Sequence, residues 1–265
     1  MIGKFEIWVL PHNLRAAYER AAEILRKTDF EDLYLNIRRD LNDLIEDLAL
    51  GAPYENFIEQ IKLKIPCEPI SYWENTIKPM LLFLRGIKLK KPNLRIICYK
   101  NSAFDDFSIK VAEKVAMLTF RVCSSGRVDL GEWRKLICDI IDKSIASTED
   151  EANYIFEIYK KAAGRRISIC ISDFSGRFLL RKIRGAEINA RLRYIFIPYH
   201  FTPLETLIRE AAEKLRRGLT VNDERIIKMV KLHAEYIREY ILMCVNFDEA
   251  YFKWLRDKRF KEYYA

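Results

Sequence analysis

Long apolar segments are missing from this 265-residue chain. No uninterrupted stretch approaches the roughly 20 apolar residues that a membrane-spanning helix needs. The first apolar residues, Phe5–Leu10, end at a proline and predict a strand, not the core of a secretory signal. We therefore expect a cytoplasmic protein with no membrane partner.

Closely spaced cysteines are also missing. The six cysteines form no CxxC pair, which argues against a structural zinc site. Cys98 and Cys170 lie inside apolar, strand-like runs and are predicted to be small core residues. A disulfide stays open as an alternative, because intracellular proteins of hyperthermophiles do form them. The cysteines are Cys67, Cys98, Cys123, Cys138, Cys170 and Cys244.

Glutamine is nearly absent, whereas charge is abundant. Gln60 is the single glutamine, and 32% of the residues are charged, which is typical of thermophiles and resembles archaeal composition. Lys and Arg number 46 against 38 Asp and Glu, so the formal net charge is +8. This balance favours anionic partners, either a small molecule or nucleic acid. A generally basic surface with no dedicated partner is the alternative.

Hydrophobic residues make up 50% of the chain, enough to bury a large core. Short apolar runs alternate with segments of helical spacing, which predicts an α/β fold with a mainly parallel sheet flanked by helices. The expected strands are 5–10, 33–37, 95–99, 166–171 and 194–197. The expected helices include 54–64, 72–84, 107–120, 130–145 and one that Ser147–Asp150 caps and that runs to about Ala163.

We predict two domains. Residues 1–202 would form the α/β domain, and residues 203–265 a helical C-terminal extension that packs on it or mediates assembly. One face of the expected helix 223–246 is apolar, so a homodimer through the C-terminal helices is possible. The residues of that face are Ile226, Val230, Ile237, Ile241 and Val245.

The candidate site consists of polar residues that directly follow the strands. The carboxyl ends of parallel strands form the crevice where ligands bind in such sheets. His12 and His200 both follow strands, so they could meet as ligands of a divalent metal or as an acid and a base. The alternative is that each imidazole caps a helix or bonds a loop carbonyl. The candidate ligand-binding residues are Asn13, Asn36, Arg38, Lys100 and Arg177.

Two further features support a site. Asp173 to Arg177 follow a strand and precede a helix, so their N–H groups and Arg177 could cradle a phosphate, with Asp173 as an acid–base group. Glu74 follows Trp73, and a carboxyl group beside a buried ring can have a raised pKa. His233, by contrast, lies near the apolar seam of the last long helix and is predicted to be buried or at an interface.

Two basic segments offer an alternative function. They are dense enough to bind phosphate backbones, although such runs are usually solvated faces. The residues of this predicted nucleic-acid surface are Lys88, Lys90, Lys91, Arg181, Lys182, Arg184, Arg191 and Arg193.

The order of elements and two local motifs carry a family resemblance. Val9–Leu14, with His12 after the first strand, and Asp32–Arg39 resemble the opening of TraB/PrgY-like proteins and the wider erythromycin-esterase/ChaN-like group. Those families place a histidine after the first strand and an acidic residue at the end of the second. Tyr72–Glu74 and Pro79 before the third strand are further parallels. The resemblance implies an α/β fold and metal-dependent hydrolase chemistry.

The chain departs from this pattern at informative positions. Asn36 stands where the family has a glutamate, and Pro11 where a glycine precedes the histidine. A late Gly-His element is replaced by Ser172–Gly176. An asparagine can be neither a carboxylate base nor a charged metal ligand. The resemblance therefore implies a metal-assisted hydrolase with a degenerate site, and the alternative is a non-enzymatic nucleic-acid-binding or complex-assembly protein.

Overall fold

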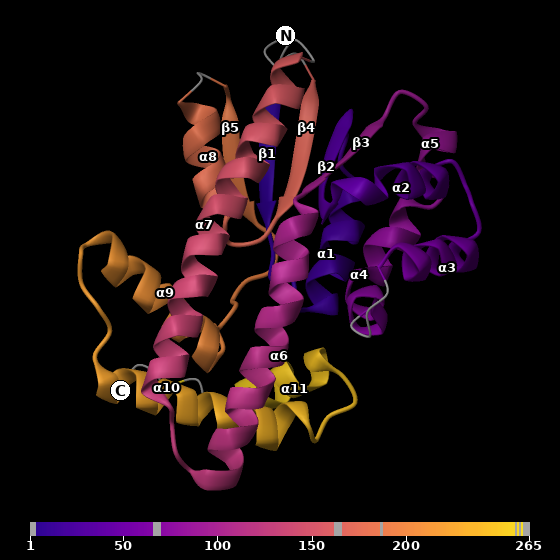
Figure 1. Cartoon of the computed structure of the whole chain (residues 1–265). Coiled ribbons are helices and arrows are strands. Elements are labelled where there is room, and N and C mark those ends of the chain that lie inside the picture. Colours follow the sequence, from indigo (N-terminus) through magenta and orange to yellow (C-terminus); the bar gives the residue numbers. More distant parts are fainter. Residues whose placement is uncertain are drawn as a thin grey trace. The chain divides into compact units, whose positions relative to one another are not determined.

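A computed structural model of the chain (Figure 1) describes residues 4–65, 70–161, 166–185 and 188–257, together with residues 259 and 261. Its contacts divide the chain into two compact units. Unit 1 comprises Met1–Ser102 and Ser147–Ile197, and unit 2 comprises Ala103–Ala146 and Pro198–Ala265. Unit 2 therefore takes in residues 103–146, which the sequence-based division assigned to the α/β domain. In the described part of the chain, we find no helix that combines the length and apolarity needed to cross a membrane.

Unit 1 contains a five-stranded sheet in which every pairing is parallel. This confirms the predicted α/β class. The strand order is β3-β2-β4-β1-β5, so β4 lies between β1 and β2 at the centre. The strands are β1 (Lys4–Val9), β2 (Asp32–Arg38), β3 (Arg95–Lys100), β4 (Ile167–Ser172) and β5 (Ala190–Tyr194).

The helices of unit 1 connect these strands, and two long helices have residues in both units. Those of unit 1 are α1 (Arg15–Leu25), the 3-10 turn η1 (Arg39–Leu41), α2 (Asn42–Ala49), α3 (Tyr54–Lys64), α4 (Ile70–Leu84), α5 (Ile87–Lys90) and α8 (Gly176–Arg184). The long helices are α6 (Ser102–Ser125) and α7 (Leu130–Lys161).

One face of the sheet packs against α8 and the second half of α7 (Figure 1). Alternate residues of each strand point to this face because the side-chain period of a strand is two. Helix α1 connects β1 to β2, and this connection runs along the sheet in the direction opposite to the connection from β4 through α8 to β5. Because such crossovers are right-handed, α1 lies on the other face of the sheet. The central cluster contains Phe5, Ile7, Val9, Tyr34, Ala152, Ile155, Tyr159, Cys170, Leu179 and Ile183.

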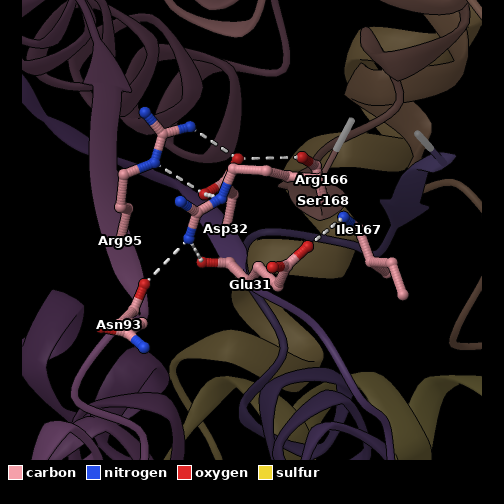
Figure 2. A network of polar contacts seen from close by, with 7 residues as sticks. All are labelled: Glu31, Asp32, Asn93, Arg95, Arg166, Ile167 and Ser168. Carbon is pink, nitrogen blue, oxygen red and sulfur yellow. Dashed lines mark hydrogen bonds and ion pairs between the residues drawn. The ribbon is translucent and has the colours of Figure 1, made fainter. Parts of the chain in front are cut away.

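The amino edge of the sheet is held by a buried carboxylate (Figure 2). Asp32 has no exposed surface and receives two hydrogen bonds from Arg95, of 2.8 and 2.7 Å. Arg166 forms a further ion pair with it at 2.8 Å, and Ser168 donates to it at 3.2 Å. Arg166 also donates to the backbone carbonyl oxygens of Glu31 and Asn93. The network ties β2, β3 and β4 together where the three strands begin.

Two sequence-based boundaries in unit 1 are wrong. The fifth strand is 190–194 instead of 194–197. Its side chains alternate between buried and exposed, as on an edge strand that is covered on one face only, so it lacks the continuous apolar run that guided the prediction. The apolar run that suggested the later position ends with Ile197, which is 73% exposed. The expected break at Ser147–Asp150 does not occur either, since α7 passes through these residues without interruption.

Unit 2 is helical in its described residues. Besides parts of α6 and α7, it contains α9 (Pro203–Arg216), α10 (Asp223–Tyr236), the π-helical turn η2 (Ile237–Ile241) and α11 (Phe247–Arg256). The prediction of a single helix over 223–246 is wrong, because α10 ends at Tyr236 and the π turn follows it. The π turn closes with a bond from Leu242 N to Ile237 O, and its wider winding shifts the apolar face. Val245, predicted on that face, is 93% exposed.

The prediction that the cysteines are core residues is confirmed for Cys98 and Cys170 but is wrong for Cys123 and Cys138, which are exposed, and Cys244 is half-buried. Cys98 and Cys170 are buried. The five cysteines within the described ranges are free thiols, and Cys67 lies outside those ranges. His233 is buried against the edge of Trp133, with ring centroids 6.5 Å apart.

Candidate functional site at the carboxyl edge of the sheet

Asp173 directly follows the central strand β4 and lies at the carboxyl edge of unit 1. The chain that follows each neighbouring strand, β1 and β2, crosses the face of the sheet opposite to α8. The end of β4 is therefore a topological switch point. The Asp173 carboxylate accepts a hydrogen bond of 2.7 Å from Ser175 N, just before α8. The predicted phosphate-binding turn thus already holds a carboxylate of the chain itself.

Gly176 allows α8 to begin this close to the sheet. A Cβ atom at this position would lie 2.9 Å from Ile7 Cγ2, 3.1 Å from Val9 Cγ2 and 3.2 Å from Ser172 Oγ. Real Cβ atoms essentially never make a contact under 3.0 Å, so only glycine fits without a shift. The position of Asp173 therefore depends on a glycine three residues later.

Glu151, on α7, is the second carboxyl group of the site. Its Oε1 accepts a hydrogen bond from Ser147 Oγ at 2.9 Å, one helical turn earlier, and one from Asn101 N at 3.5 Å after β3. Within the described residues, Oε2 has no hydrogen-bond partner. One oxygen of Glu151 is thus fixed by the protein and the other is left for a ligand.

The pKa of Glu151 is raised from an ordinary value of 4.5 to about 7. Burial is the largest cause, and the negative charge of Asp173 adds to it. The hydrogen bond from Ser147, the charge of Lys100 and the bond from Asn101 act in the opposite direction but do not cancel the shift. A carboxyl group that exchanges its proton near neutral pH is suited to general acid–base catalysis.

A second layer of contacts holds α7 in place beside the sheet. Arg39, after β2, donates to Tyr99 O at 2.8 Å and to Asp150 Oδ2 at 2.6 Å. Its guanidinium group also lies 4.0 Å from the centre of the Tyr154 ring. Asn101 Nδ2 donates to the same Asp150 oxygen at 3.0 Å. These contacts join β2, β3 and α7 and so position the neighbouring Glu151.

The charge of Asp173 also reaches α1 on the other side of the site. Burial and the charge of Asp173, with a smaller effect of Tyr72, raise the pKa of Tyr18. Tyr72, in the first turn of α4, donates to Asn13 O at 3.2 Å. A row of polar groups therefore runs along the carboxyl edge from Lys100 past Glu151 and Asp173 to Asn13.

The structure places several predicted residues at this edge. Asn13 and Asn36 each have a buried Oδ1 atom with no hydrogen-bond partner in the described chain. His12 is exposed in the loop before α1. Arg38, by contrast, binds Asp40 through two hydrogen bonds of 3.1 and 2.8 Å, and this hydrogen bonding lowers the pKa of Asp40.

Another predicted residue has a partner of its own, and one belongs to the other unit. Glu74 accepts a hydrogen bond of 3.0 Å from Tyr54, whose pKa is raised chiefly by burial and by this bond. His200 belongs to unit 2, where its backbone N and O both contact Tyr251 Oη, at 2.8 and 3.2 Å. The meeting of His12 and His200 therefore stays a prediction.

The basic residues of the alternative function do not form one face. In this set, Lys88 pairs with Glu46, and Arg177, a predicted ligand-binding residue on the same helix as Arg181, donates a hydrogen bond to Tyr194 Oη at 2.5 Å. Arg191 and Arg193 point away from the face that α8 covers, because Ala190, Leu192 and Tyr194 pack on that face. Of the remaining residues, Lys91 pairs with Asp29, whereas Lys90, Arg181 and Arg184 are exposed and Lys182 is half-buried.

The described residues offer no ready set of metal ligands. No group of three or more His, Cys, Asp and Glu side chains in these ranges is arranged to hold a metal ion. Glu151 and Asp173 supply two carboxylates, which falls short of such a set. The expected divalent metal site therefore has no matching ligand group in this part of the chain.

Comparison with known proteins gives no match to any family model, curated protein or solved structure. The TraB-like resemblance accordingly stays a prediction.

Sequence reasoning missed Glu151, Arg39 and Asp150. It treated Ser147–Asp150 as a helix cap, whereas Ser147 contacts Glu151 within an unbroken helix. The available signal was a hydroxyl and a carboxyl group four residues apart, which lie on the same face of a helix.

Proposed function

We propose that unit 1 is the catalytic part of a hydrolase, of the diverged TraB-like kind that the sequence resembles, with Glu151 as its general acid. The observation that carries the proposal is the half-buried Glu151 carboxyl group, whose pKa is raised to about 7 beside the charge of Asp173. Two carboxyl groups in different environments at a sheet's ligand-binding edge are a common arrangement for paired acid and base roles.

The proposed reaction is the hydrolysis of an ester by water. Asp173 accepts a proton from the attacking water, whose oxygen bonds to the acyl carbon. The bond from that carbon to the alcohol oxygen then breaks, and protonated Glu151 donates its proton to the leaving alcohol. Afterwards both carboxyl groups return to their starting states by proton exchange with solvent. The scheme has no metal-dependent step.

Lys100 and the two asparagines have positioning roles in this proposal. The positive charge of Lys100 acts on Glu151 and would also offset negative charge on the acyl oxygen during attack. The unpartnered Oδ1 atoms of Asn13 and Asn36 would accept hydrogen bonds from polar groups of the substrate. An anionic small-molecule ester fits this combination of one lysine and several polar groups.

The test compares two esters that differ in their leaving groups. Phenyl acetate releases a phenolate that benefits from a proton, whereas the p-nitrophenolate of p-nitrophenyl acetate leaves without one. We expect Glu151→Gln to lower kcat/KM for phenyl acetate by about 100-fold and for p-nitrophenyl acetate by much less. The wild-type rate on phenyl acetate should fall as the pH rises above about 7, because Glu151 then loses its proton.

Glu157→Gln is the matched control, since Glu157 is exposed on the same helix. It should leave both rates unchanged. Equal effects of the two substitutions, or an equal loss on both esters with Glu151→Gln, would show that Glu151 is not a general acid. Absence of hydrolysis of both esters by the wild-type protein would contradict ester hydrolysis itself.

A further inference from the structure

Unit 2 contains a cavity of about 310 Å³ at the turn between α6 and α7. This volume is at the lower end of the range for small-molecule sites. The cavity belongs wholly to unit 2, so it is separate from the site at the sheet edge. Its wall combines apolar side chains with arginines and hydroxyl groups.

The apolar part of the wall comes from Leu118, Val128 and Trp133. Trp133 has no exposed surface, and its indole Nε1 has no hydrogen-bond partner in the described residues. A buried donor without a partner is costly to the folded protein. This wall therefore suits an apolar group of a ligand.

The charged part of the wall comes from Arg121 and Arg127. In the described structure neither guanidinium group has a carboxylate partner; Arg121 contacts only the sulfur of Met117, at 3.8 Å. Asp129 also lines the cavity, but its Oδ1 accepts a hydrogen bond of 3.1 Å from Glu132 N at the start of α7. Two positive charges thus face one carboxylate that already caps a helix.

The turn that carries these residues is held by its own hydrogen bonds. Ser124 and Ser125 donate to Arg121 O at 3.2 and 2.7 Å, and Ser125 Oγ accepts from Arg127 N at 3.2 Å. Gly126 has a φ of 70°, a conformation that glycine adopts without strain. The backbone around the cavity is therefore formed before any ligand arrives, which reduces the ordering cost of binding.

We propose that this cavity binds a small organic anion, with its phosphate or carboxylate group on Arg121 and Arg127 and its apolar body against Leu118, Val128 and Trp133. Guanidinium groups bind both kinds of anion through paired N–H donors. The apolar wall distinguishes such a ligand from inorganic phosphate. The site is additional to the proposed hydrolase site and does not depend on it.

The test is isothermal titration calorimetry of the full chain with three probes: phenyl phosphate, inorganic phosphate and benzyl alcohol. Phenyl phosphate should bind at least tenfold more tightly than either of the others, because only it has both parts. Arg127→Ala should weaken its binding about tenfold, which corresponds to the loss of one charge-assisted contact.

Lys135→Ala is the matched control. Lys135 is exposed on α7 and does not line the cavity, so its removal takes away one positive charge without changing the site. Equal weakening by Arg127→Ala and Lys135→Ala would reduce the effect to net charge and overturn the proposal. Equal affinities for phenyl phosphate and inorganic phosphate would overturn the role of the apolar wall, and no binding of phenyl phosphate would overturn the site.

Discussion

Both carboxylate oxygens of Asp32 accept hydrogen bonds from Arg95, at 2.8 and 2.7 Å, although Asp32 is completely buried. This pairing raises the pKa of Arg95, chiefly through the hydrogen bonds to Asp32, so the guanidinium group keeps its charge. Together with Arg166 the pair joins three neighbouring strands at their amino ends (Figure 2). A buried charge of this kind is strongly unfavourable without its partners.

Asp32→Asn is therefore expected to lower the free energy of unfolding by about 2–3 kcal/mol, since two arginines lose their counter-charge. The estimate is at the low end for buried pairs because Arg95 and Arg166 can turn toward solvent. Asp29→Asn is the control: Asp29 is 89% exposed and pairs with Lys91 at 3.3 Å, so its loss should cost under about 0.5 kcal/mol. Urea denaturation of both variants measures the difference, and equal losses would contradict a structural role for the network.

Gly176→Ala is expected to destabilise the protein by about 1–3 kcal/mol, because the added methyl group overlaps Ile7 and Val9 of β1. It should also displace Asp173 and lower hydrolysis of phenyl acetate. Gly131→Ala is the opposite case, since Gly131 lies in α7 and its nearest atom would be 3.5 Å away. That change should be neutral or stabilising by up to about 1 kcal/mol. Thermal unfolding curves separate the two, and a neutral Gly176→Ala would show that the contact is easily relieved.

Glu151 is expected to make stability decrease with rising pH. Its folded-state pKa, about 7, lies above the ordinary 4.5, so between these values the folded protein binds more protons than the unfolded chain. The resulting decrease in the free energy of unfolding is absent below pH 4.5 and complete above about pH 7. Glu151→Gln removes it and should raise the free energy of unfolding at pH 8 by on the order of 2 kcal/mol relative to pH 4.5. Parallel measurements on Glu157→Gln should show no such difference between the two pH values.

His233 is expected to act in the opposite direction. Burial lowers its pKa from 6.5 to about 4, so the unfolded chain binds more protons between these values and stability falls as the pH falls through this window. Neither ring nitrogen has a hydrogen-bond partner in the described residues. His233→Leu should therefore stabilise the protein by about 1 kcal/mol at pH 7 and by more at pH 5. Urea denaturation at the two pH values checks this, and a variant that is less stable at both would show that the imidazole has an unseen partner.

Much of unit 1 could be predicted from the sequence because its strands are short apolar runs with clear helical segments between them. Local pattern was enough for β1 to β4 and for burial of Cys98 and Cys170. It failed for β5, where arginines alternate with apolar residues on an edge strand that is covered on one side only. The strand order could not be predicted, because it depends on contacts between residues far apart in the chain.

The candidate site was predicted only in part. Asp173 directly follows a strand, and Asn36 and Lys100 lie in the last residues of strands, so the parallel-sheet rule finds them. Glu151 comes from the middle of a helix of 32 residues, and only the packing of that helix on the sheet brings it to the edge. Its raised pKa arises from burial, which no local pattern of residues reports.

The central place of β4 has a consequence for how the chain acquires its structure. Strand β1 pairs only with β4 and β5, both of which come after residue 166. A nascent chain that ends before Ser172 therefore has β1 without a neighbour, while β2 and β3 can already pair. Completion of the sheet must wait for a strand that is inserted between two earlier ones. The sheet is therefore completed late in synthesis, and shortened fragments leave an apolar strand open to association with other chains.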